Sequence, residues 1–218
     1  MEPIEEFDEA FGKFRENMKD VTSATPVIHT SAEVFNQIFR HILWSEPPGR
    51  QSEEEVQGAS RSNWTFHIAF AIKRAAQIMN LSCRFETRGR LDAVIETIEE
   101  KPRVVLLAEW EWDPKSIFGK GKELEKLWKG TSNLQHANAL LFTYCPASET
   151  GDFVKAVTAY WQERAARRKK GHPILYLNIA VYNRDSSVEV IEFIGMIEVH
   201  AEGVKVWGGP FLCRSPYL

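Results

Sequence analysis

Three short apolar runs constrain the fold of this chain more than any other feature, and they cover residues 104–108, 137–144 and 174–182. Each run is far shorter than the roughly 20 apolar residues that a membrane-spanning helix needs. Runs of this length with little polar alternation are typical of strands buried within a sheet. We therefore predict a protein built on a central sheet, with no segment that crosses a membrane.

Segments with helical spacing accompany these runs. Apolar residues recur every three or four positions after Ser31 and again across residues 63–80, so two buried helices are predicted. Residues 120–130 predict a helix that stops at its final glycine, and residues 152–169 predict another. Three phenylalanines share one helical face within residues 1–20, where we expect an amphipathic helix.

The spacing changes towards two from Ser82 onward, where apolar residues alternate with charged ones. This alternation predicts two paired strands with a turn near Gly89. A third strand is expected over residues 103–112, and two more over 188–200 and 204–207.

The order of these elements predicts an α/β fold, a mixed sheet with helices on both faces. At 218 residues, the chain has the length of one elaborated domain. We expect a single domain over residues 1–218, with residues 1–45 as an N-terminal helical extension. Residues 45–62, rich in Pro, Gly, Ser and Glu, are expected to form a loop.

Composition and charge narrow the function classes. Hydrophobic residues make up 44% and charged residues 26%, as in globular proteins, so disorder is not indicated. The net charge of −3 gives no overall attraction to nucleic acid, and DNA binding would need a local basic surface. Cys83, Cys145 and Cys213 form no C-x-x-C pair, so neither a zinc cluster nor a disulfide framework is expected. The acidic N-terminal stretch lacks the features of a signal peptide, and we expect a cytoplasmic protein.

Three acidic residues interrupt strands that are otherwise largely apolar. Asp92 lies in the second strand of the predicted pair, and Glu109 and Glu111 lie near the end of the third strand. Alternate residues of a strand share a face, so the two glutamates project together, with Trp110 and Trp112 on the other face. If the two strands are neighbours, Asp92 approaches Glu109, and three carboxylates share a small volume.

A divalent cation is the economical partner for such a cluster. Burial and mutual repulsion raise the pKa of neighbouring carboxyl groups, and a cation favours their ionised form. Oxygen ligands without His or Cys favour Mg²⁺ or Mn²⁺ over Zn²⁺. Such a metal activates water and stabilises charge on a phosphoryl group, so phosphodiester hydrolysis is the natural chemistry.

Residues 63–144 resemble the PD-(D/E)XK restriction-endonuclease-like nucleases. That family has an Asp at the start of one core strand and an acidic-x-lysine triplet on the next. Here Asp92 takes the first place and Glu109-Trp110-Glu111 the triplet. The resemblance implies a restriction-endonuclease-like fold and a Mg²⁺-dependent DNA endonuclease. It also implies that Asp92, Glu109 and the Trp110 carbonyl ligate the metal, and that Glu111 orients or deprotonates water.

Two departures from the family pattern leave alternatives open. Glu111 stands where lysine is usual, and Lys126 on the following helix is a spatial substitute for that lysine. The helix over residues 63–80 has no acid, whereas many relatives have one there. This departure favours a one-metal site or a catalytically inactive binding or regulatory module. The simplest alternative is a solvated strand edge whose acids pair with surface arginines, and a glycosidase carboxylate pair fits the i, i+2 spacing poorly.

The run RAARRKK at the end of the helix over residues 152–169 is a local basic feature. Cations at a helix C-terminus interact favourably with the helix dipole, which is the simpler explanation. The alternative is contact with DNA phosphates, made by Arg164, Arg167, Arg168, Lys169 and Lys170. The oligomeric state stays open, with a homodimer among the options.

Four tryptophans lie within helical apolar patterns, and we expect them in the core rather than on nucleic acid bases. They are Trp44, Trp64, Trp128 and Trp161.

Overall fold

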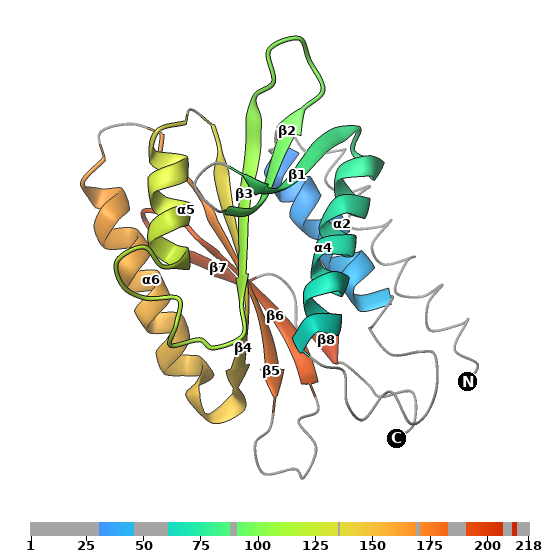
Figure 1. Ribbon diagram of the computed structural model, residues 1–218. Coiled ribbons are helices and arrows are strands. Elements are labelled where there is room, and N and C mark those ends of the chain that lie inside the picture. The colour runs from blue at the N-terminus through green and yellow to red at the C-terminus, as the bar shows by residue number, and fades with distance from the viewer. Residues whose placement is uncertain are drawn as a thin grey trace, which may run out of the picture. The chain divides into compact units, whose positions relative to one another are not determined.

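The computed structural model describes residues 31–45, 61–87, 91–134, 136–168, 171–182, 191–206 and 211–212 (Figure 1). Its helices are α2 (Ser31–Ser45), α4 (Arg61–Ile78), α5 (Glu123–Ser132) and α6 (Thr150–Ala166), with the 3-10 helix η1 (Ala147–Glu149) before α6. Its strands are β1 (Leu81–Thr87), β2 (Leu91–Thr97), β3 (Val104–Glu111), β4 (Asn138–Pro146), β5 (Leu175–Tyr182), β6 (Ile191–Val199), β7 (Val204–Val206) and β8 (Phe211–Leu212). Some predictions lie outside the described residues. They are the helix over residues 1–20, most of the loop over residues 45–62, the turn at Gly89, and the phosphate contacts of Lys169 and Lys170.

The strands form a mixed sheet in the order β1-β2-β3-β4-β5-β6-β7, and β8 pairs with β6. The pairs β3–β4 and β4–β5 are parallel, whereas β1–β2, β2–β3, β5–β6 and β6–β7 are antiparallel. Parallel neighbours need crossover connections, which α5 and α6 provide. The predicted mixed α/β class is confirmed. The sequence pattern does not predict β8.

Helices α2 and α4 bury apolar stripes against one set of sheet side chains. Fully buried members of the two stripes are Phe35, Phe39, Ile68 and Ile72. They belong to one hydrophobic cluster that also contains residues of β2, β3 and β4. The stripe explains why both segments are helical, since residues three or four positions apart lie on one face. Burial of α4 is limited to this stripe, because Phe66 and Phe70 are 74% and 50% exposed.

Helices α5 and α6 pack on the alternate set of sheet side chains. Leu124 and Leu127 of α5 share a second hydrophobic cluster with Val157 and Trp161 of α6. Along β4, successive residues belong to the two clusters in turn, because neighbouring side chains of a strand point to opposite faces. Figure 1 shows the α5–α6 pair and the α2–α4 pair with strands between them.

The predicted end of α5 at Gly130 is wrong, because the helix continues to Ser132. A Cβ added at Gly130 would lie 2.5 Å from Leu107 Cδ1. The glycine therefore allows close packing of α5 on β3 and does not terminate the helix. Glycine often marks the end of a helix, but here its lack of a side chain is used for packing within the helix.

Residues from Ala32 onward form one compact unit. The N-terminal part of the expected extension lies outside the described residues, whereas α2 contributes to the core. Trp161 is buried as predicted, but Trp64 and Trp128 pack against the core and stay partly exposed, and the side chain of Trp44 lies outside the description. None of the described helices has the length and hydrophobicity required to cross a membrane.

Candidate active site

Asp92 and Glu109 are neighbours on adjacent antiparallel strands. Ala93 of β2 is opposite Ala108 of β3, so the next pair outward is Asp92 with Glu109. Asp92 Oδ2 accepts a hydrogen bond of 2.8 Å from the Trp110 N–H. This bond extends the contact between β2 and β3 beyond the last main-chain pair. The expected approach of these two carboxylates therefore follows from the strand register.

Glu109 is an almost fully buried carboxylate, with 1% of its surface exposed. Its Oε2 accepts a hydrogen bond from Lys126 Nζ at 3.0 Å, and its Oε1 has no hydrogen-bond partner. Lys126 lies on the first turns of α5, which packs on β3. The structure thus brings the Lys126 ammonium group next to the Glu109 carboxylate.

Glu123 is a third carboxylate in this group, and it was not among the predicted site residues. Its Oε1 lies 3.4 Å from Lys126 Nζ, and its Oε2 is buried without a hydrogen-bond partner. The side chain is 12% exposed. The spacing of three residues between Glu123 and Lys126 places both on one face of a helix, and this was the sequence signal for its membership.

The pKa values of this group reflect burial and like charge. Burial, followed by the charge of Asp92, raises the pKa of Glu109 to about 8, although Lys126 opposes the shift. Burial also raises the pKa of Asp92, partly offset by the Trp110 N–H and by Lys126. Burial acts to lower the pKa of Lys126, but its hydrogen bond to Glu109 and the nearby carboxylates raise it on balance. A proton on Glu109 and a cation beside it are therefore alternative ways to balance the charge.

Glu111 differs from the other predicted acids because its carboxylate is bound to the main chain. The N–H groups of Trp112 and Asp113 donate to Glu111 Oε1 at 2.6 and 3.2 Å. Thr143 Oγ1 donates to the Glu111 carbonyl at 2.8 Å, which fixes the end of β3 against β4. The Glu111 carboxylate therefore accepts hydrogen bonds from two main-chain N–H groups just beyond the end of β3. Its action on water stays a prediction.

Trp110 and Trp112 point away from the carboxylates, as the alternation of β3 predicts. Both pack against the cluster formed with α2 and α4. Trp110 makes an edge contact with Phe85 at 6.5 Å between ring centroids, and Trp112 stacks on Tyr144 at 3.8 Å. These contacts fix the opposite face of the strand end. The Trp110 carbonyl as a metal ligand stays a prediction.

Asp92, Glu109 and Glu123 provide only oxygen donors, the ligand type that Mg²⁺ and Mn²⁺ prefer. Within the described ranges, no three His, Cys, Asp or Glu side chains converge in an arrangement that could hold a metal ion as they stand. Asp92 and Glu109 nevertheless provide two neighbouring carboxylates, and the buried Oε1 of Glu109 and Oε2 of Glu123 have no hydrogen-bond partner. Mg²⁺ commonly takes one or two protein carboxylates and completes its shell with water and phosphate oxygens. The residues present fit that mode of binding.

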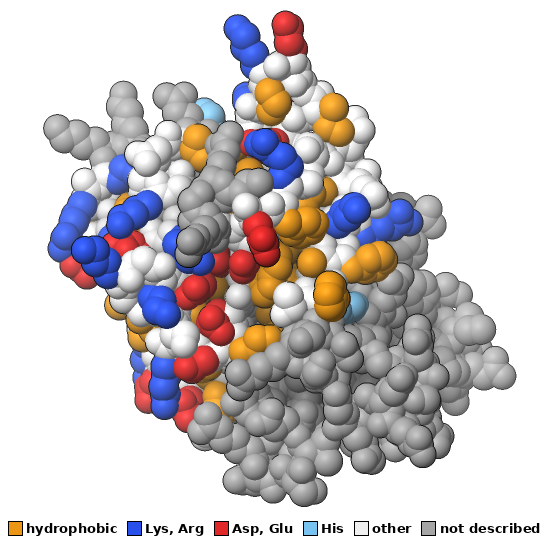
Figure 2. All heavy atoms as spheres, viewed as in Figure 1, with side chains coloured by type: hydrophobic (Ala, Val, Ile, Leu, Met, Phe, Trp, Pro, Cys, Tyr) orange, Lys and Arg blue, Asp and Glu red, His pale blue; other side chains and the backbone are white. Residues whose placement is uncertain are grey.

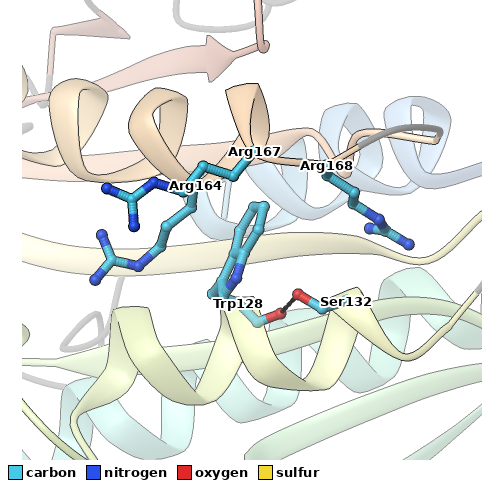
Figure 3. Close-up of a pocket in the computed structure, with 5 residues that line it drawn as sticks. All are labelled: Trp128, Ser132, Arg164, Arg167 and Arg168. Atoms are coloured by element: carbon cyan, nitrogen blue, oxygen red, sulfur yellow. Dashed lines mark hydrogen bonds between the residues drawn. The ribbon is translucent and has the colours of Figure 1, made fainter.

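The predicted basic residues lie on a separate part of the surface. Arg164, Arg167 and Arg168 line a pocket of about 420 Å³ together with Trp128 and Ser132 (Figure 3). Figure 2 shows acidic side chains running down the described part of the drawn face, between a group of Lys and Arg side chains and a hydrophobic area.

Comparisons with models of known protein families, with curated proteins and with solved structures find no match for this chain.

Proposed function

We propose that this protein is a metal-dependent nuclease of the restriction-endonuclease-like type, with a mixed sheet covered by helices on both faces. The observation that supports this proposal most is the pair formed by buried Glu109 and half-buried Asp92, with Lys126 beside it. A carboxylate is costly to bury unless a proton, a cationic side chain or a metal ion balances its charge. Placing two carboxylates and an ammonium group on three elements of the core is typical of functional sites.

The side chains have distinct roles in the proposed reaction. Asp92 and Glu109 provide the carboxylate oxygens for Mg²⁺ or Mn²⁺, and Glu123, whose Oε1 lies 3.4 Å from Lys126 Nζ, forms an ion pair that positions the ammonium group. A metal bound there lowers the pKa of water and stabilises charge on the phosphoryl oxygens. Lys126 Nζ, 3.0 Å from Glu109 Oε2, donates to the attacking water or to a phosphate oxygen held next to that carboxylate. The scissile phosphodiester of DNA is the proposed substrate.

A cleavage assay tests this function. Supercoiled plasmid and single-stranded DNA are incubated with Mg²⁺ or Mn²⁺ and with the wild type, Asp92→Asn or Glu109→Gln. The control is Asp152→Asn, because this carboxylate is 93% exposed on α6. We expect the wild type and the control to cleave and both site variants to lose at least about 100-fold in rate. Equal rates in all four proteins would refute the assignment.

A catalytically inactive binding or regulatory module is the second candidate. The ion pair between Lys126 and Glu109 supports it, because this pair neutralises the carboxylate without a metal. Glu111 in place of lysine is consistent with the same function. DNA binding by the wild type, with no metal-stimulated cleavage of either substrate, is the result expected of such a module.

A further inference from the structure

The pocket between α5 and α6 is built from groups that recognise different parts of a nucleotide. Three guanidinium groups come from α6 and the turn that follows it, and an indole and a hydroxyl come from α5. In Figure 3, the Trp128 ring stands between Arg164 and Arg167 on one side and Arg168 on the other. The volume of about 420 Å³ falls within the range of small-ligand sites.

The arginine side chains are not used to terminate α6. The last carbonyl groups of the helix accept hydrogen bonds from main-chain N–H groups, Arg167 N to Arg164 O at 3.2 Å and Arg168 N to Ala165 O at 2.9 Å. Main-chain N–H groups therefore cap the end of α6, and the guanidinium groups are not needed for this capping. Their placement at the negative end of the helix dipole remains favourable.

The three guanidinium groups are held differently, and the pocket keeps an excess of positive charge. Arg164 lies over the Tyr160 ring, 3.5 Å from its centroid, and donates to the Tyr160 carbonyl at 3.1 Å. Arg167 pairs with Glu163. Arg168 Nη1 is buried and has no hydrogen-bond partner. Among the described residues, one carboxylate therefore pairs with one of three arginines, and two guanidinium charges remain for an anion.

Trp128 provides a fixed aromatic surface beside this charge. Its ring meets the buried Trp161 edge-on, with centroids 5.2 Å apart and an interplanar angle of 89°. Trp128 lines the pocket and is only partly buried. Ser132 donates its hydroxyl to the Trp128 carbonyl, which ties the two pocket residues of α5 together.

We propose that this pocket binds one unpaired nucleotide of a nucleic acid strand, with the phosphate at Arg164 and Arg168 and the base stacked on Trp128. Guanidinium groups bind phosphate in two-point geometry, and aromatic side chains stack on bases of any sequence. A duplex presents its phosphates but keeps its bases stacked on each other, so it would leave Trp128 unused. The inference rests on the proposed function for the identity of the ligand as nucleic acid, and it makes single-stranded DNA the preferred substrate class.

The pocket and the carboxylate group lie on different sides of α5. Lys126 and Trp128 are two residues apart, which corresponds to about 200° around a helix. Binding in the pocket can therefore be measured separately from metal-dependent cleavage. If the pocket does not bind nucleic acid, binding in EDTA is absent. If the catalytic proposal is wrong, binding in EDTA is unchanged and metal-dependent cleavage is absent.

The test is fluorescence anisotropy of a labelled oligothymidylate of about 12 nucleotides in EDTA, with the full chain. The variants are Arg164→Gln/Arg168→Gln and Trp128→Leu, and Lys155→Gln is the control, since this exposed lysine lies on the same helix. An unlabelled blunt duplex of the same length and inorganic phosphate serve as competitors. Circular dichroism verifies that each variant is folded. A further variant, Trp128→Phe, keeps an aromatic ring at this position and tests whether stacking is what Trp128→Leu removes.

We expect the double arginine variant and Trp128→Leu each to weaken binding about tenfold or more, and Trp128→Phe and Lys155→Gln to change it less than about threefold. The slope of log affinity against log salt should fall by at least about 0.7 in the double arginine variant. The wild type should bind the oligothymidylate in EDTA even if cleavage is never observed, so a failed catalytic proposal leaves this result unchanged. Three results would overturn the proposed binding site. They are no binding by the wild type, equal losses of affinity in Lys155→Gln and the double arginine variant, and competition by the duplex as strong as that by the single strand.

Discussion

Lys126 Nζ lies 3.0 Å from Glu109 Oε2, so the buried carboxylate at the end of β3 is held by an ammonium group from the helix that follows it. The lysine side chain is 24% exposed and the glutamate side chain 1%. The ion pair thus connects the core to a partly open surface. Glu109 is also beside Asp92, and its balance of charge depends on both neighbours.

Replacement of Glu109 by glutamine should stabilise the protein at alkaline pH. The pKa of Glu109 is raised to about 8 in the folded protein, above the usual value of about 4.3 for an unfolded chain. The contribution of Glu109 to the free energy of unfolding is therefore most favourable below its pKa in the unfolded chain. It is lost as pH rises towards 8, at no more than about 1.4 kcal/mol per pH unit. Urea unfolding in EDTA between these limits should show this fall in the wild type.

Glu109→Gln removes the titrating group and keeps the shape of the side chain. Its free energy of unfolding should therefore fall less steeply over the same pH range. A parallel pH profile for the two proteins would mean that Glu109 is ionised throughout and that its burial is balanced without a proton.

Replacement of Lys126 by methionine should separate cleavage from metal binding. The variant loses the donor beside Glu109, so cleavage should fall by at least about 100-fold. Mn²⁺ affinity measured by calorimetry should stay the same or rise, because a competing cation has been removed from the carboxylate. Lys129→Met is the matched control, since Lys129 lies on the same helix, is 65% exposed and pairs with Glu125.

A loss of Mn²⁺ affinity in Lys126→Met equal to its loss of cleavage would contradict this role. Lys126 would then be a positioning residue that organises the carboxylates. Lys129→Met should change neither property.

Replacement of Gly130 by alanine should destabilise the protein although alanine favours helices. The added Cβ would lie 2.5 Å from Leu107 Cδ1, and Leu107 is fully buried on β3. We expect a loss of about 1–3 kcal/mol in the free energy of unfolding, as for other overpacked core sites. Gly151→Ala on α6 is the control, because its Cβ would meet nothing within 4 Å.

Gly151→Ala should be neutral or stabilising by up to about 1 kcal/mol. A gain of similar size in Gly130→Ala would show that Leu107 moves aside at little cost. Chemical denaturation of the three proteins gives the comparison.

Local patterns in the sequence predicted the part of the site that depends on strands. The alternation around Asp92 and the apolar run before Glu109 gave two strands, and their antiparallel pairing placed the two acids together. The same alternation predicted that the side chains of Trp110 and Trp112 lie on the face of β3 opposite to Glu109. These features depend on a repeat of two residues, which a sequence displays directly.

Other features depend on how α5 docks, and the sequence does not display docking. Glu123 joins the site because α5 turns that face towards β3, and Gly130 stays helical because Leu107 packs against it. Trp128 fits a core pattern but lies at the edge of α5, where a pocket leaves it partly exposed. The Glu111 carboxylate binds main-chain N–H groups because β3 ends at this residue. The spacing of acidic residues in the sequence does not predict this use of the carboxylate.

The most direct measurement is calorimetric titration of Mn²⁺ into the wild type, Asp92→Asn, Glu109→Gln and the control Asp152→Asn, near pH 8. If Asp92 and Glu109 hold the cation together, each single replacement should weaken binding at least about tenfold, while Asp152→Asn binds as the wild type does. Mn²⁺ binding of equal affinity in all four proteins, or no binding to the wild type, would contradict the metal site.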